Sequence, residues 1–447
     1  MSGKKNFSRG LSTLFIIAIM LFAVGCGGGG NENANDGSKK LSMDKIEEKT
    51  SDPALEEQKI DEGRKLYNIG DYVGAIKLYD EVVALNPKNI DVYNERGNAY
   101  HELNQYDKAI ADYGKAIELN PSNFIPYYNR GNAHSNVGEY EQAIEDYNKA
   151  IELEPSDTDS YINRGEAYFS LEEYEQAGND YNQAVELNPD NAYTYYRLGA
   201  SYCNLGQYEQ AIEELNTSIE LDPDNSLACF YLGRAHWELG NALRSIYFYG
   251  KAIELDPNFL DAYNNRGVEY LRLGQNEDAI SDFNKAIELN PNFDKAYNNR
   301  GNAYGALEQY DKAIADFTKA IELNPDYITA YGNRGVAYVY LEQYEKALSD
   351  FSKVIELNPD IAGTYCLRGT TYYMLDNNDL AIKDAEKALE LDPNMYSASK
   401  LLEVAREGVN NGNEPANVEE LNDEGLNLEI QGDSKDSKID KGLKQLK

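Results

Sequence analysis

Proline recurs along this chain at a fixed interval, and this regularity restricts the folds that the chain can adopt. The recurring prolines lie 34 residues apart, at Pro53, Pro87, Pro121, Pro155, Pro189, Pro223, Pro257, Pro291, Pro325, Pro359 and Pro393. A sequence period of about 20 to 50 residues is typical of solenoids and other repeat arrays. We therefore interpret most of the 447 residues as one array and not as a series of separate globular domains.

Each 34-residue unit has the pattern of two short helices. When proline is numbered as position 32, the first unit begins at Glu56 and the tenth ends at Met395. Position 8 is glycine in all ten units, and position 20 is alanine in nine, with Ser245 as the exception. Apolar and small residues recur at spacings of three and four, which is the helical period. Small residues at positions 8 and 20 let two helices approach closely, and proline ends the second helix because it cannot continue the backbone hydrogen bonds.

The repeated pattern resembles the tetratricopeptide repeat over residues 56–395. A representative unit is DKAYNNRGNAYGALEQYDKAIADFTKAIELNPDY, residues 294–327. The resemblance implies an all-α fold, a right-handed superhelical α-solenoid whose first helices line a concave groove for a ligand peptide. One hairpin cannot bury its apolar face alone, so the repeats must stack. The ten predicted helix-turn-helix repeats span residues 56–89, 90–123, 124–157, 158–191, 192–225, 226–259, 260–293, 294–327, 328–361 and 362–395.

Both ends of the array have the features of terminal elements. Asp52 followed by Pro53 predicts a helix start, because an acidic capping residue precedes a proline in the first turn. Residues 396–408 are amphipathic and more polar than the repeats, as expected of a C-terminal capping helix. Residues 409–447 are polar and rich in Asp, Glu, Lys, Asn and Gly, a composition that predicts a mostly disordered tail.

The first 25 residues have the pattern of an export signal. Lys4, Lys5 and Arg9 precede an apolar run of 14 residues, 11–24. This run is shorter than the roughly 20 residues that a membrane-spanning helix needs. A basic start, a short apolar run and small residues are typical of a secretory signal peptide, which we predict over residues 1–25.

The residues that follow the apolar run resemble the lipobox of bacterial lipoproteins. The motif is AVGC, Ala23 to Cys26, with alanine where leucine is usual. The resemblance implies cleavage before Cys26, a diacylglycerol on its thiol, and export to the cell envelope, anchored at the outer face of the cytoplasmic membrane or at the outer membrane. Residues 26–51, which begin with a run of glycines, would then serve as a flexible tether. The alternative is an ordinary signal peptide with an incidental cysteine.

The charge balance restricts the partners of this chain. Lys plus Arg number 42 against 77 Asp plus Glu, a net charge of −35. Binding to nucleic-acid phosphates requires a basic patch, so we expect no nucleic-acid partner, and we expect membrane contact only through the lipid anchor. Basic or neutral protein partners are electrostatically favoured. The simpler explanation of the charge is the solubility of a long exposed array.

The first helices of repeats three to six carry unusually many aromatic residues. Aromatic residues and arginine are enriched at binding hot spots, and asparagine can hydrogen-bond a ligand backbone without reading its sequence. We therefore predict an anchor pocket beside a polar track for an extended peptide. The alternative is that these aromatic residues pack on one another and tighten the middle of the array. The candidate groove residues are Ile125, Tyr128, Ile162, Phe169, Tyr193, Tyr196, Arg197, Leu227, Phe230, Tyr231, Arg234 and Trp237, followed by Asn264, Asn265, Asn298, Asn299 and Asn302.

Arginine at position 7 and aspartate at position 23 occur in the same seven repeats. A semi-buried charge needs a partner, so this joint occurrence predicts an ion pair between the two helices of one hairpin. A ligand-binding role for these arginines is the alternative. The predicted pairs are Arg96 with Asp112, Arg130 with Asp146, Arg164 with Asp180, Arg266 with Asp282, Arg300 with Asp316, Arg334 with Asp350, and Arg368 with Asp384.

The sequence contains no motif that predicts catalysis, a metal or a cofactor. The three histidines do not have metal-ligand spacing, and no glycine-rich phosphate loop follows a strand pattern. Cys203 and Cys229 lie about 12 Å apart along parallel helices at 1.5 Å per residue, too far for a disulfide, so we expect free thiols.

The leading hypothesis is a lipid-anchored adaptor for a protein partner in envelope assembly, secretion or pilus biogenesis. The alternative is a structural spacer or surface protein without a defined ligand.

Overall fold

The computed structural model describes residues 52–411, and this part of the chain contains helices and no strand. The predicted signal peptide, the lipidation site at Cys26 and most of the predicted tail lie outside the described residues. No helix within residues 52–411 is both long and apolar enough to cross a membrane. The helices are α1 (Pro53–Asn68), α2 (Tyr72–Leu85), α3 (Ile90–Glu102), α4 (Tyr106–Leu119), α5 (Phe124–Asn136), α6 (Tyr140–Leu153), α7 (Thr158–Ser170), α8 (Tyr174–Leu187), α9 (Ala192–Asn204), α10 (Tyr208–Leu221), α11 (Ser226–Glu238), α12 (Ala242–Leu255), α13 (Leu260–Arg272), α14 (Asn276–Leu289), α15 (Asp294–Ala306), α16 (Tyr310–Leu323), α17 (Ile328–Tyr340), α18 (Tyr344–Leu357), α19 (Ala362–Met374), α20 (Asn378–Leu391) and α21 (Tyr396–Asn411).

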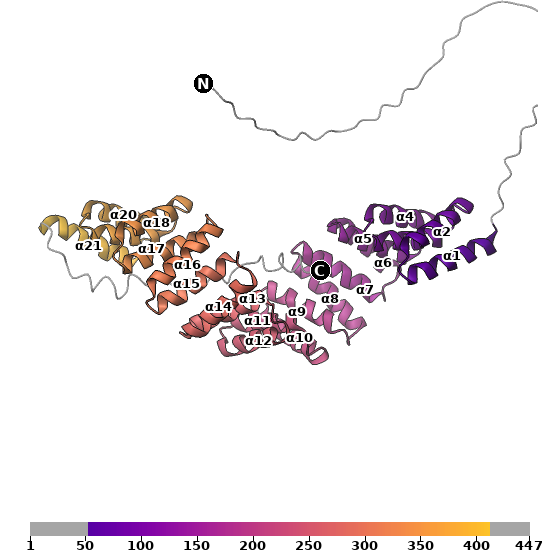
Figure 1. Ribbon diagram of the computed structural model, residues 1–447, viewed down its shortest axis with the longest axis horizontal. Helices are drawn as coiled ribbons and strands as arrows, with labels where there is room; N and C mark the ends of the chain where they lie inside the picture. Colours follow the sequence, from indigo (N-terminus) through magenta and orange to yellow (C-terminus); the bar gives the residue numbers. More distant parts are fainter. Residues whose placement is uncertain (1–51, 412–447) are drawn as a thin grey trace, which may run out of the picture. The chain divides into compact units, whose positions relative to one another are not determined.

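The helices follow one another as a series of hairpins, one for each 34-residue unit (Figure 1). Each odd-numbered helix up to α19 is the first helix of a repeat and packs against the even-numbered helix that follows it. Each second helix also packs against the first helix of the next repeat, and several consecutive first helices touch each other. The all-α solenoid architecture that the sequence predicts is therefore confirmed.

The sequence signals at the helix ends have the expected structural effect. The carboxylate of Asp52 accepts hydrogen bonds from the backbone N–H groups of Ala54 and Leu55 and so caps α1, which begins at Pro53. Position 15 of every repeat, in the turn within the hairpin, has a positive φ. Glycine occupies half of these turns, as at Gly70, whereas others hold a residue such as Glu172 in the less favourable left-handed region.

The invariant glycine at position 8 allows the two helices of a hairpin to pack closely. A Cβ atom on Gly301 would lie only 2.6 Å from Cε1 of Phe317, and in repeats one to nine the same glycine faces the equivalent Tyr, Phe or Leu. In the tenth repeat, Gly369 faces Leu401 of α21 instead. Alanine at position 20, as in Ala313, is fully buried. Position 8 therefore excludes any side chain because a large side chain of a following helix, an aromatic ring in most repeats, occupies that space.

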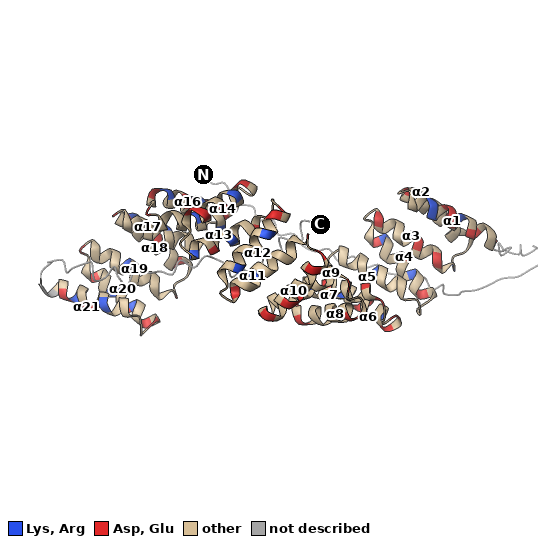
Figure 2. Cartoon of the chain, turned by 90° about the horizontal axis from the view of Figure 1, so that it is seen from below, with Lys and Arg blue, Asp and Glu red and all other residues tan. Residues whose placement is uncertain are grey.

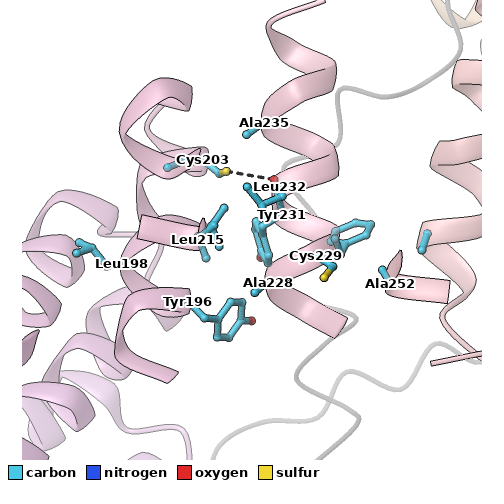
Figure 3. Close-up of a cluster of buried hydrophobic side chains, with 14 of the residues drawn as sticks. Tyr196, Leu198, Cys203, Leu215, Ala228, Cys229, Tyr231, Leu232, Ala235 and Ala252 are labelled. Carbon is cyan, nitrogen blue, oxygen red and sulfur yellow. Dashed lines mark hydrogen bonds between the residues drawn. The ribbon is translucent and has the colours of Figure 1, made fainter. Parts of the chain in front are cut away.

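The largest buried apolar cluster lies in repeats four to seven. Figure 3 shows part of it, with Tyr196 and Tyr231 facing each other between neighbouring first helices and Leu215 packed beside them. Cys203 and Cys229 are buried free thiols here, and the Cys203 thiol donates to the carbonyl of Tyr231. At the C-terminal end, α21 packs against α19 and α20 and covers the last repeat.

Candidate interaction surface

The arginine and aspartate that occur together form ion pairs within their own hairpins. In all seven repeats, Nε of the arginine donates to Oδ2 and Nη2 donates to Oδ1, with Nη2–Oδ1 distances of 2.5–2.8 Å. The aspartates are buried, and the arginines are mostly buried. The arginine and aspartate that occur together in a repeat therefore form a bidentate ion pair between its two helices.

Five of these arginines also reach the preceding repeat, a contact that the sequence analysis missed. Their Nη1 atoms donate to position 25 of the previous second helix; Arg300, for example, reaches Asn284 Oδ1 at 2.6 Å. The other acceptors are Asp80, Asn148, Thr318 and Ser352. Comparing position 25 with position 7 of the following repeat would have found this signal. With all three guanidinium nitrogens engaged, these five arginines hold the array together and are not available to a ligand.

A polar ladder connects the first helices of neighbouring repeats. An asparagine at position 6 donates to positions 5 or 9 of the preceding repeat, as Asn333 does to Asn298 and Asn302. The Nδ2 atom of Asn299 likewise donates to Oδ1 of Asn264. Equivalent bonds join Asn129 to Asn94 and Asn98, and Asn163 to Tyr128 and Asn132.

The predicted open asparagine track is therefore wrong in repeats seven and eight. The side chains of Asn264, Asn298, Asn299 and Asn302 are buried between consecutive first helices. In the ladder, Asn299 donates to Asn264, and Asn298 and Asn302 both accept from Asn333. Asn265 is partly exposed and accepts from Asn264. Close contact between consecutive first helices is the physical reason, because positions 5 and 9 face the neighbouring repeat.

Most of the predicted aromatic anchors are also internal, which corrects the prediction of an open aromatic pocket. Besides the four asparagines, five apolar and aromatic candidates are buried, namely Ile162, Phe169, Tyr196, Phe230 and Tyr231. The ring of Phe230 stacks on Phe259 with centroids 4.8 Å apart, and it also contacts Tyr231 and Tyr249. At these positions the packing alternative holds, because the aromatic rings fill the space between consecutive repeats.

Arg197, a candidate groove residue, forms its ion pair within the protein and is not available to bind a ligand carboxylate. Its guanidinium lies 4.0 Å from the ring centroid of Phe169, and its Nη2 donates to Glu166 Oε2 at 2.7 Å. Glu166 Oε1 also accepts from the hydroxyl groups of Tyr181 and Tyr193. Burial alone would lower the pKa of Arg197, but Glu166 and the surrounding tyrosines raise it well above its usual value. This cluster replaces the asparagine ladder between repeats four and five.

The exposed part of the predicted groove is smaller and lies at position 2. Ile125 and Tyr193 are 42% and 41% exposed on the first helices of repeats three and five. In repeats two and four, position 2 holds the exposed acids Asp91 and Asp159. We call Ile125 and Tyr193, with the partly exposed Tyr128, Leu227, Arg234 and Trp237, the first-helix surface.

Trp237 is partly exposed and lies near a buried carboxyl group. It interacts with Glu269, whose side chain is fully buried at a position that is alanine in most repeats. Burial raises the pKa of Glu269, and Arg272 and Trp237 oppose this shift in part. Arg272 Nη1 lies 3.3 Å from Glu269 Oε1. The Glu269 carboxyl group is therefore buried next to Arg272, with Trp237 as a weaker neighbour.

The described residues offer no group of His, Cys, Asp and Glu side chains that could hold a metal ion. His236 is buried and stacks on Phe248, and the His134 ring bonds to Glu139. Cys366 is a third buried free thiol. These histidine and cysteine side chains within residues 52–411 thus pack against or bond to other parts of the array.

The comparisons with known proteins agree with this architecture. Models described as "TPR repeat" match residues 63–103, 97–138, 165–206 and 200–240. Models described as "Tetratricopeptide repeat" match residues 125–157, 227–259, 260–293, 294–327, 328–361 and 362–395. No curated protein matches the chain.

Several solved structures align with parts of the array. YrrB, described as a TPR protein with an unusual peptide-binding site, is 30% identical over 44% of this chain and 97% of its own, with a TM-score of 0.37. MamA from Desulfovibrio magneticus RS-1 is 26% identical over 38% of this chain and 95% of its own, with a TM-score of 0.36. A tetratricopeptide repeat protein from Parabacteroides merdae is 20% identical over 56% and 99%, with a TM-score of 0.43.

The family models together match most of the chain, and the hairpins that they match are the ones that the structure shows. Families of this kind are protein-interaction scaffolds, and no family of enzymes is among the models that match. The chain belongs to the tetratricopeptide repeat family.

Proposed function

We propose that this protein is a lipid-anchored adaptor that binds an extended segment of a protein partner along its first-helix surface. The repeat architecture supports protein binding in general. The observation that carries the specific proposal is the exposure of Ile125 and Tyr193, because apolar residues here replace the acids of neighbouring repeats. Exposed apolar groups of this kind are typical of interaction sites.

The arrangement of position 2 also indicates the chemistry of the partner segment. Asp159 belongs to repeat four, between the repeats that carry Ile125 and Tyr193. An extended segment that contacts both apolar residues passes this carboxylate. We therefore expect apolar side chains separated by a basic residue, a pattern that also suits the overall acidic charge. The proposed setting is the cell envelope, in assembly, secretion or pilus biogenesis.

Capture from a detergent extract of the native envelope tests the binding proposal. The full chain should retain a specific protein, and the Ile125→Asp, Tyr193→Ala double variant should lose it. Tyr340→Ala is the matched control, because Tyr340 is an exposed tyrosine on the first helix of repeat nine. Equal retention by wild type and the double variant, both folded by circular dichroism, would place the binding site elsewhere.

A structural spacer is the second candidate, and one observation favours it. Most of the predicted groove residues pack between the repeats, so much of the first-helix face stabilises the array itself. A spacer has no specific partner. The same capture experiment would support it by retaining no protein that depends on Ile125 or Tyr193.

Anchoring is tested separately at Cys26. The signal-like residues 1–25 and the AVGC motif support a lipidated cysteine. We expect Cys26→Ala to release the protein from the membrane fraction or to leave an uncut precursor. A wild-type protein that is wholly soluble, with no lipid on Cys26 by mass spectrometry, would contradict the anchor.

A further inference from the structure

The second helix of repeat six differs from the other second helices on its outward side. Leu243, at position 18, is 80% exposed, and Tyr247, one turn later, is 56% exposed. Position 18 is Val73 in the first repeat and an acid in all the others, namely Asp107, Glu141, Glu175, Glu209, Glu277, Asp311, Glu345 and Asp379. Thus α12 exposes a large apolar side chain where most repeats place a carboxylate, and a second one at position 22, where the other repeats hold Lys, Ala, Glu, Asn or Ser.

Packing within the array does not account for these two side chains. Neither residue belongs to the buried cluster that contains Tyr249 and Ala252 of the same helix. Tyr247 makes an edge contact with Phe248, with ring centroids 5.1 Å apart, yet more than half of it stays exposed. Single exposed apolar residues are common, but two large ones at i and i+4 form a contiguous patch.

Basic side chains accompany the apolar pair. Arg244 is exposed beside Leu243, and Lys251 lies one turn beyond Tyr247, where it pairs with Glu254 at 2.6 Å. We call Leu243, Arg244, Tyr247 and Lys251 the α12 patch. The second helices of the repeats before and after carry exposed acids at equivalent positions, Glu209 and Glu213 in α10 and Glu277 and Asp278 in α14. Figure 2 shows acidic and basic residues along the array.

We propose that the α12 patch binds the α12 patch of a second copy of this chain. A two-fold interface brings the same surface of both copies together, so it needs an apolar centre and charges of both signs. Antiparallel α12 helices would place Tyr247 of one copy against Leu243 of the other, because these residues are one turn apart. The basic side chains of each copy would then face acids contributed by repeats five and seven of the other.

The rest of the second-helix surface explains why association would be confined to this patch. Acids at position 18 of eight repeats make two copies repel one another elsewhere. In repeat six, apolar and basic side chains take the place of these acids, so the repulsion is absent there. This surface lies on second helices, so the inference is independent of binding to the first-helix surface.

Sedimentation of the purified full chain over a concentration series tests the proposal. Wild type should show a reversible monomer–dimer equilibrium, and the Leu243→Glu, Tyr247→Glu variant should be monomeric at the same concentrations. Both substitutions introduce residues found at these positions in other repeats, such as Glu209 and Glu213, so folding is preserved. Arg244→Glu should weaken dimerisation about tenfold or more.

Ile69→Glu is the matched control, because Ile69 is 78% exposed in a turn away from the patch. Its sedimentation should equal that of wild type. A wild-type chain that is monomeric throughout the series would overturn the proposal, even if another protein then bound to α12. A dimer that persists in the double variant would also overturn it, because association would then involve another segment.

Discussion

Replacing Asp316 with alanine should lower the stability of repeat eight by about 3 kcal/mol, because it leaves a mostly buried arginine without its partner. Arg300 donates to both carboxylate oxygens of Asp316 at 2.7 Å. Asp316 is buried and Arg300 is mostly buried, so water cannot fully replace the lost bonds. The remaining contact of Arg300 with Asn284 belongs to the preceding repeat and does not join the hairpin.

Native-state hydrogen exchange of α15 and α16 is the appropriate measurement, because repeat arrays can open locally instead of unfolding in one step. Glu322→Ala is the control, since it removes the exposed Lys319–Glu322 pair on the same second helix. Exposed pairs contribute at most about 1 kcal/mol. If both variants lowered the local stability equally, the hairpin ion pair would contribute no more than an exposed surface pair, which would contradict the account.

Glu166→Asn and Arg197→Asn should each destabilise the contact between repeats four and five by about 3 kcal/mol, because each leaves a mostly buried charged partner without its opposite charge. The combined variant should recover most of this loss. The preceding junction shows why: Asn163 donates to Asn132 Oδ1 at 2.9 Å, and Asn132 also accepts from Tyr147. Asparagine at both positions would therefore recreate at the next junction a ladder that the chain already uses.

A double-mutant cycle measures this coupling, with local stability of α7 and α9 read by hydrogen exchange. The account predicts a large favourable coupling energy between positions 166 and 197. Additive losses in the combined variant would show that the arginine, its carboxylate and the rings do not act as a unit. Thr217→Ala, a change on the outer helix α10, should leave the same amides unaffected.

The hairpins and the ion pairs could be predicted because their signals lie within one repeat. Gly301 at position 8 faces the Phe317 ring of its own second helix, and Arg300 bonds to Asp316 sixteen residues later. Both features recur every 34 residues, so a comparison of units reveals them. The contact of Arg300 with Asn284 joins two repeats, so a comparison of residues within single units does not reveal it.

The exposure of the first-helix face could not be predicted in the same way. The helical period shows that Tyr231 and Asn298 lie on the same face of their respective first helices. Their burial depends on how closely the neighbouring first helix approaches. That distance is set by side chains from two repeats together, such as Tyr196 and Tyr231, whose ring centroids lie 5.8 Å apart. Ile125 and Tyr193 escape burial because position 2 lies at the edge of this contact.

Photo-crosslinking in living cells tests the central claim most directly, because it records what touches the first-helix surface without extraction. A photoreactive amino acid would replace Ile125 or Tyr193 in the full chain, with Tyr340 as the control position. Binding along the first-helix surface predicts that positions 125 and 193 crosslink to the same partner protein and that position 340 does not. Crosslinks at position 340 with none at 125 or 193 would contradict it.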